Sequence, residues 1–253
     1  MVYAIGRLEL DFLSPTHLAS LSQRLGFHPS DQVTLVKHLK KTPSDAELIS
    51  WILTIDETPA YHIVPRGAFA RDTYARLVEF LEDMTEGVER ISVAGVTAGV
   101  SWLSSGIDVP SLVPELRSLA SWTTDALVKS VVGEKSEEAK RGQITDFLQR
   151  IYFDLRSRGT TPSERAVNFA ATEALTDLND VFGDALKRGL QLDEISVESA
   201  PIVRPQSQVL DVKLAFFDPE NTHRAGRTYR ISVDVSTPLP ARIGEGFRSW
   251  PSR

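Results

Sequence analysis

The sequence predicts an α+β protein with a mixed αβ N-terminal part, central helices and a C-terminal antiparallel β-sheet. Three observations favour this class. Apolar residues alternate along residues 2–12, as in a strand with one buried face. They recur at helical spacing between residues 162 and 178. Three further strand-like runs follow toward the C-terminus, at residues 195–203, 209–217 and 228–235.

The N-terminal part combines strands with short helices. We expect the strand at residues 2–12 to join the C-terminal strands in one sheet. The following elements are helices at residues 15–25, 31–41 and 68–84, a hairpin of strands 48–55 and 61–65, and a strand at 91–103. Gly95 and Gly99 lie inside the last strand, where glycine indicates a bulge or a close backbone approach. Packing explains these glycines better than a ligand does.

The central part is expected to be helical. Residues 109–132 predict a loop followed by a helix, and the polar residues 131–143 are the candidate flexible segment. We still expect the chain, residues 1–253, to form a single domain. A helix through Leu155 should end near Gly159, which can take the left-handed conformation.

The next helix begins at a well-defined signal. Thr161 is the expected N-cap, Pro162 occupies the first helical position, and Glu164 lies three residues after the cap. This combination is a capping box with its proline. We expect the helix to continue to about residue 187. Arg165, Asn168 and Thr172 are spaced three and four apart, so they share its polar face.

The strands at residues 209–217 and 228–235 flank a polar loop and predict an antiparallel pair. Asp211 and Lys213 share one face of the first strand, and Arg230 and Asp234 share one face of the second. A register that aligns these faces can place Lys213 opposite Asp234, which is a stabilising pair.

Composition excludes several functions. The net charge of −6 disfavours general binding to nucleic-acid phosphate. The chain has no cysteine, so thiolate nucleophiles, disulfides and cysteine metal sites are excluded. No apolar run approaches about 18 residues and no signal peptide opens the chain. We therefore expect a cytoplasmic protein that binds neither membrane nor nucleic acid.

No catalytic motif or metal-ligand spacing is found, so we expect no cofactor, no metal and no recognisable catalytic residue. Ser101, Ser104 and Ser105 surround Trp102, but no sequence context makes any of them a nucleophile. Asp211 and Asp234 can face each other as an acid/base pair, although structural ion pairing explains them better. Five histidines are present without ligand spacing, namely His17, His28, His38, His62 and His223.

Arginines give the remaining candidates. A guanidinium can clamp a carboxylate or a peptide terminus, although pairing with acids inside the fold is the simpler explanation. The candidate ligand- or peptide-binding residues are Arg7, Arg165, Asn168, Asp211, Arg230 and Asp234.

Long blocks of the sequence carry a family resemblance. They are YAIGRLE at residues 3–9, SWILTID at 50–56, VPELRSLASWTTDALV at 113–128, FLQRIYFDLRSRGTTPSERAVNFAATEA at 147–174, LDVKLAFFDPENTHRAGRTYRISVDVS at 210–236 and FRSW at 247–250. On these blocks the chain resembles the C-terminal domain, a domain of unknown function, of the PatG and PatA proteins of cyanobactin biosynthesis.

The resemblance implies a role in a pathway that modifies ribosomally made peptides. In that family the domain follows a subtilisin-like protease, whose triad lies in another domain and has no counterpart here. The first hypothesis is an accessory, non-catalytic protein that binds the precursor peptide or partner enzymes. The alternative is an uncharacterised peptide-modifying enzyme, a cyclase or an isomerase. A structural homodimer is the third.

Overall fold

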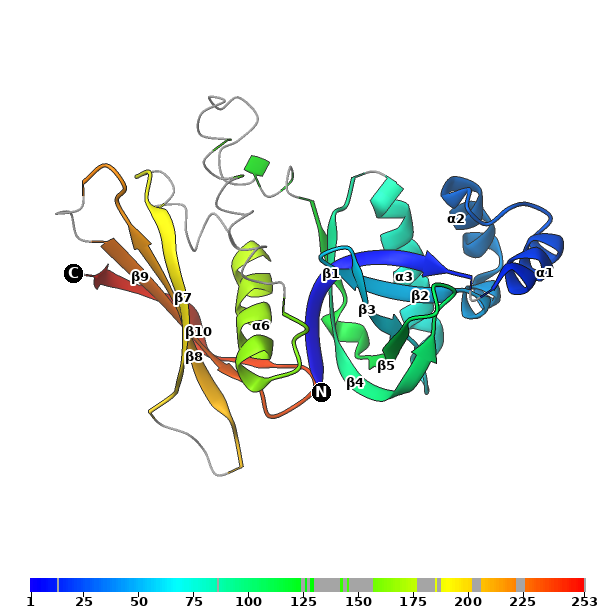
Figure 1. The fold of residues 1–253 in the computed structure, drawn as a ribbon. Coiled ribbons are helices and arrows are strands. Elements are labelled where there is room, and N and C mark those ends of the chain that lie inside the picture. The colour runs from blue at the N-terminus through cyan, green and yellow to red at the C-terminus, as the bar shows by residue number, and fades with distance from the viewer. Residues whose placement is uncertain are drawn as a thin grey trace. The chain divides into compact units, whose positions relative to one another are not determined.

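A computed structural model describes residues 1–12, 14–85, 87–123, 126, 128–129, 142, 145, 157–176, 185, 188–201, 206–221 and 226–252. The fold is α+β, as predicted (Figure 1). Contacts divide the chain into two compact units, Met1–Thr123 and Thr124–Arg253. The expectation of a single domain stays a prediction, and the candidate flexible segment 131–143 lies almost wholly outside the described residues. No helix in the described part of the chain has both the length and the apolar character that crossing a bilayer requires.

The first unit is built on a six-stranded sheet with short helices. Its elements are β1 (Val2–Asp11), α1 (Pro15–Leu25), α2 (Gln32–Lys41), η1 (Pro43–Leu48), β2 (Ser50–Ile55), β3 (Thr58–Ile63), α3 (Ala70–Thr85), β4 (Arg90–Trp102), β5 (Asp108–Pro114), η2 (Leu116–Ser118) and β6 (Ala120–Trp122). The predicted strands, hairpin and three helices of this part are confirmed, with Ser14 as the N-cap of α1.

The sheet closes on itself. Its order is β1-β2-β3-β5-β4, and β4 also pairs with β1, so these five strands form a ring with β6 added beside β4. All pairs are antiparallel except β3 with β5. The expectation that the first strand joins the C-terminal strands is therefore wrong. Alternation tells which face of a strand is buried, but it does not identify the partner strand.

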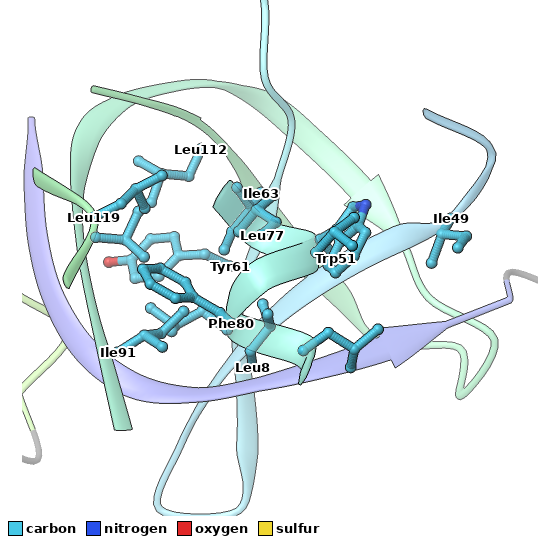
Figure 2. Close-up of a cluster of buried hydrophobic side chains, with 14 of the residues drawn as sticks. Leu8, Ile49, Trp51, Tyr61, Ile63, Leu77, Phe80, Ile91, Leu112 and Leu119 are labelled. Atoms are coloured by element: carbon cyan, nitrogen blue, oxygen red, sulfur yellow. The ribbon is translucent and has the colours of Figure 1, made fainter. Parts of the chain in front are cut away.

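The main hydrophobic core of the first unit lies among the strands of the ring and helix α3, and a smaller cluster is formed by Ile52, Leu103 and Val109. Trp51 on β2, Tyr61 on β3 and Phe80 on α3 are almost completely buried and belong to the main core (Figure 2). The Trp51 Nε1–H donates a 2.9 Å hydrogen bond to the Ala46 carbonyl, so the indole's polar atom is satisfied in the interior. Helix α3 therefore contributes its apolar side to the same core as the ring of strands.

The two glycines inside β4, Gly95 and Gly99, allow backbone geometry that a side chain would disturb. A Cβ on Gly95 would lie 2.1 Å from the carbonyl oxygen of Val113 on β5. Gly99 has a φ of 93° and sits where the β4–β5 register shifts. The predicted close approach and bulge are both confirmed, the first at Gly95 and the second at Gly99.

The loop predicted at the start of residues 109–132 is wrong, whereas the helix predicted toward residue 132 agrees with the helical conformation of Ala126, Val128 and Lys129, which the structure describes. Residues Asp108–Pro114 form β5, and Ala120–Trp122 form the short β6. Pro110 and Pro114 explain why β5 was not predicted. Proline cannot donate a hydrogen bond to a β-ladder and usually argues against a central strand.

The second unit contains α6 (Pro162–Thr176), β7 (Gln191–Ser199), β8 (Val209–Phe217), β9 (Gly226–Asp234) and β10 (Ala241–Ser252). The strands form an antiparallel sheet in the order β10-β9-β8-β7, which confirms the predicted β8–β9 pair. Strand β10 was not predicted. Gly244 and Gly246, both with positive φ, and Pro251 interrupt the alternation that identifies a strand.

Helix α6 covers one face of this sheet (Figure 1). The buried apolar side chains of that face are Leu210, Val212, Leu214, Phe216, Tyr229, Ile231 and Val233. Alanines on α6, including Ala166 and Ala170, are also buried and allow close packing. The helix is described to Thr176, and its expected continuation to residue 187 lies mostly outside the described residues, as does the helix expected before Gly159.

The capping box at the start of α6 is confirmed. The Glu164 N–H donates to Thr161 Oγ1 at 3.2 Å, and Glu164 Oε2 accepts from the N–H groups of Thr160 and Thr161 at 2.8 and 3.0 Å. Gly159, just before it, has the expected left-handed φ of 67°. Burial alone would raise the pKa of Glu164, but these hydrogen bonds hold the pKa below its ordinary value.

The cap gives a pH-dependent stability. Thr161→Ala should lower the free energy of unfolding by about 0.5–2 kcal/mol at pH 7. Because the pKa of Glu164 is lowered in the folded state, its stabilising effect is present above the ordinary pKa of 4.5 and is lost as the pH falls. In urea unfolding, the free energy of unfolding of wild type should exceed that of Glu164→Gln at pH 7, and this difference should shrink below pH 4.5. A difference that grows on acidification would contradict this.

Candidate functional site

Five of the six predicted site residues lie in the second unit, and Arg7 lies in the first. Arg7 is exposed on β1, and its carbonyl accepts a 3.3 Å hydrogen bond from Thr54 Oγ1 on β2. Arg7 therefore has a place in the ring of strands of the first unit, while the other five candidates are described within the second unit.

Arg165 is buried at the contact between α6 and the sheet. Its side chain donates to the Val235 carbonyl at 2.7 Å and to the Thr160 carbonyl at 3.3 Å. Its buried Nε has no hydrogen-bond partner. Burial lowers the pKa of the guanidinium. Two neutral acceptors do not compensate the charge, so Arg165 fastens α6 to the end of β9 at an electrostatic cost.

Asn168 lies one turn further along α6 and is completely buried. Its Oδ1 accepts a 3.4 Å hydrogen bond from Ser157 Oγ, and its carbonyl accepts from Thr172 Oγ1 at 3.0 Å. The predicted polar face of the helix is therefore an internal polar seam. It ties the segment before the helix to the helix itself.

Asp211 and Arg230 meet on the other face of the sheet, opposite α6. Asp211 is 4% exposed and accepts from Ser232 Oγ at 2.5 Å and from Arg230 Nη1 at 3.4 Å. Both partners come from β9, and Ser232 lies directly opposite Asp211 in the ladder. The carboxylate is thus held by a hydroxyl and a cation, which suits a structural role.

The expected pairing of Lys213 with Asp234 is wrong. Lys213 lies opposite Arg230, and its Nζ pairs with Glu198 of β7 at 2.5 Å. Asp234 lies opposite Val209 and accepts from the N–H and the hydroxyl of Ser236 at 2.9 and 2.5 Å. The register is shifted from the expected one, so Asp211 and Asp234 do not stand opposite each other as an acid/base pair.

The true register creates a row of cations. Lys213, Arg230 and Arg248 lie directly opposite one another on β8, β9 and β10, and we call them the basic row. Like charges in directly opposite positions destabilise a sheet. Glu198 and Asp211 compensate the first two, while Arg248 is exposed at the end of the row. The arrangement favours an anion across β9 and β10.

Exposed apolar side chains share this face, as the register of the strands shows. The guanidinium carbon of Arg230 lies 5.5 Å from the centre of the Trp250 ring. Trp250 and Phe217 are each 38% exposed, and Ile243 is 49% exposed. We call this surface, with the basic row, the polar face. It offers both charge and apolar contact area, which is the composition of energetically important binding surfaces.

Sequence reasoning found Arg230 and Asp211 but missed the β10 members of the polar face. Arg248 and Trp250 were not candidates, because β10 itself was not recognised. The FRSW block at residues 247–250 carried the available signal, since it contains both side chains.

A second polar cluster was also missed, in the first unit. His62 Nδ1 lies 2.7 Å from Ser101 Oγ, which in turn lies 2.6 Å from Ser111 Oγ. These residues come from β3, β4 and β5, and they are 39 and 10 residues apart in the chain. No local motif could indicate this arrangement.

The chain is a two-unit α+β protein in which a closed ring of five strands precedes a helix-covered antiparallel sheet. It belongs to the PatG domain family. The family described as PatG Domain matches residues 1–101, and the family described as PatG C-terminal matches residues 134–250. The chain is also similar to a solved structure described as "PatG Domain of Unknown Function", with 31% identity and a TM-score of 0.89, over 99% of this chain and 98% of that chain. No curated protein matches the chain.

Proposed function

We propose that this protein is an accessory binding protein of a cyanobactin-like pathway and that the polar face of its second unit holds a precursor peptide without catalysing a change in it. The proposed place of action is the cytoplasm, where ribosomal peptides are made. The observation that carries the proposal is the basic row with Trp250 beside it. Membership of the PatG family supports the peptide-modifying context.

The donors of Arg230 explain how a peptide can bind. A guanidinium has five N–H donors, and Arg230 uses one of them on Asp211. Asp211 and Trp250 fix the position of the group, so its remaining donors are held in place for a carboxylate or for backbone carbonyls. Arg248 adds a second cation one strand away. The face therefore suits a peptide segment that carries acidic side chains next to apolar ones.

The exposed aromatic and aliphatic side chains supply the rest of the contact. Trp250, Phe217 and Ile243 remain substantially exposed. Burial of apolar surface contributes roughly 25 cal/mol per Å², so covering a few such side chains is worth several kcal/mol before the cost of association. A partner enzyme with an acidic segment can use the same face, and a homodimer is the remaining possibility for this surface.

Native mass spectrometry of the protein mixed with a precursor peptide encoded beside its gene tests this proposal. We expect a complex in which the peptide mass is unchanged. The double variant Arg230→Gln/Arg248→Gln should weaken binding at least about tenfold, because hydrogen bonds to charged groups are worth about 1.5–3 kcal/mol each. Raising the salt concentration should weaken binding by wild type more than by this variant.

The control is the double variant Lys37→Gln/Arg71→Gln, which removes two exposed cations from the first unit and the same total charge. It should bind as wild type does. Equal weakening by both double variants would show that net charge, rather than the polar face, governs binding. A changed peptide mass would instead favour the peptide-modifying enzyme.

A further inference from the structure

The cluster of His62, Ser101 and Ser111 lies in the first unit, on the side of the sheet that faces away from the main core. Ile63 and Leu112, the next residues along β3 and β5, point into that core. Because successive side chains of a strand alternate, His62 and Ser111 point the other way. His62 and Ser111 are also directly opposite each other in the parallel β3–β5 pair. The three side chains are thus held by paired backbone rather than by a loop.

The distances fix a chain of hydrogen bonds. Ser101 Oγ is 2.7 Å from His62 Nδ1 and 2.6 Å from Ser111 Oγ. One arrangement satisfies all three groups: the Ser111 hydroxyl donates to Ser101, and the Ser101 hydroxyl donates to the unprotonated Nδ1. In that arrangement the Ser101 hydroxyl proton is already hydrogen-bonded to the base, His62 Nδ1. The Ser101 oxygen is oriented by the Ser111 hydroxyl.

The environment keeps the imidazole neutral. Burial lowers the pKa of His62, and the Asp11 carboxylate on β1 partly opposes that shift. Asp11 is itself held by the N–H of Ser104 at 2.9 Å and by the Ser104 hydroxyl. Neutral imidazole is the form that accepts a proton, so the base is ready at neutral pH.

The side chains of His62 and Ser101 are accessible to solvent, whereas Ser111 is buried. His62 and Ser101 are half-buried, whereas Ser111 is only 4% exposed. A reagent can therefore reach the half-buried hydroxyl of Ser101, which the buried Ser111 orients.

We propose that Ser101 is a nucleophile that accepts an acyl group from an activated carboxylic ester, with His62 as its general base. Ser101 Oγ forms a bond to the ester carbonyl carbon as its proton passes to His62 Nδ1. The bond from that carbon to the leaving oxygen then breaks, and the proton passes from His62 to the leaving group as an alcohol. The product is an acyl ester of Ser101, which water can hydrolyse by the reverse proton transfers. Ser111 is a positioning residue in this step.

The test uses p-nitrophenyl acetate as the acyl donor and the full chain as the protein. Peptide mass spectrometry should find acetylated Ser101, formed faster than acetylated Ser163, an exposed serine on α6 that serves as an internal reference. His62→Asn keeps a polar atom near the Nδ1 position but removes the base. It should slow Ser101 acetylation about 10²- to 10⁴-fold without changing the thermal unfolding midpoint by more than a few degrees.

The pH profile separates the base from a structural partner. Since the pKa of His62 lies below its ordinary value of 6.5, acetylation of wild-type Ser101 should be constant above about pH 6.5 and fall below it. Ser111→Ala should lower the plateau without abolishing that profile. The proposal is overturned if Ser101 reacts no faster than Ser163, or if His62→Asn folds normally and leaves its rate unchanged. Neither result bears on peptide binding by the second unit.

Discussion

Replacing Arg165 by alanine is expected to lower the free energy of unfolding of the second unit by about 3 kcal/mol. The change removes hydrogen bonds from a cation to the carbonyls of Val235 and Thr160, and each such bond is worth about 1.5–3 kcal/mol. Val235 is completely buried, so its carbonyl loses a partner that water cannot easily replace. Relief of the buried charge offsets part of the loss.

Urea unfolding measures this effect, and two further variants sharpen it. Arg165→Met keeps most of the apolar volume and should still be clearly less stable than wild type. Arg248→Met removes an exposed arginine from the same unit and should change stability by no more than about 0.5 kcal/mol. If Arg165→Met were as stable as wild type, Arg165 would not serve the fold, and its role as a ligand group would have to be reconsidered.

Replacing Gly95 by alanine is expected to destabilise the first unit by at least about 3 kcal/mol. The new Cβ would lie 2.1 Å from the Val113 carbonyl oxygen and 2.9 Å from its carbonyl carbon. These are backbone atoms of the paired strand β5, so no side chain can move aside to relieve the contact. Overpacking usually costs about 1–3 kcal/mol, and separation of two ladder strands raises that cost.

Gly67→Ala is the matched control for the same unit. Gly67 has a φ of 79°, and a Cβ there meets nothing within 4 Å. Its cost is that of the left-handed backbone alone, about 1–2 kcal/mol. The thermal unfolding midpoint should therefore be highest for wild type, lower for Gly67→Ala and lowest for Gly95→Ala. The reverse order of the two variants would mean that β4 and β5 separate easily at Gly95.

Local signals in the sequence predicted local structure well. Thr161 is a helix cap as expected, and Gly159 takes the expected left-handed conformation. In each case a few neighbouring residues determine the hydrogen bonds, so the sequence contains the whole signal.

Partner choice among strands was much harder to predict. The strand at residues 2–11 was correctly recognised, but it pairs with β2 and β4 rather than with the C-terminal sheet. In the β8–β9 pair the strands were right, yet Lys213 lies opposite Arg230 and not opposite Asp234. The two registers differ by four residues, an even number that keeps the same faces, so the apolar pattern cannot distinguish them.

The candidate site shows the same limit. Asp211 and Arg230 could be named because their strands were recognised, whereas Arg248 and Trp250 depended on β10, whose glycines and proline hide it. Arg165 and Asn168 were also named from the sequence, but the structure places both in the interior. Spacing alone cannot tell a buried polar face of a helix from an exposed one.

Peptide binding by the polar face of the second unit can be tested on the whole protein. Amide hydrogen exchange of the full chain, measured with and without saturating precursor peptide, tests it most directly. We predict slower exchange in β9 and β10, residues 226–234 and 241–252, because a bound peptide covers these strands. The amides of β1–β5 should be unaffected. Protection confined to residues 1–123, or no protection of β9 and β10 by a peptide that demonstrably binds, would mean that the polar face does not bind the peptide.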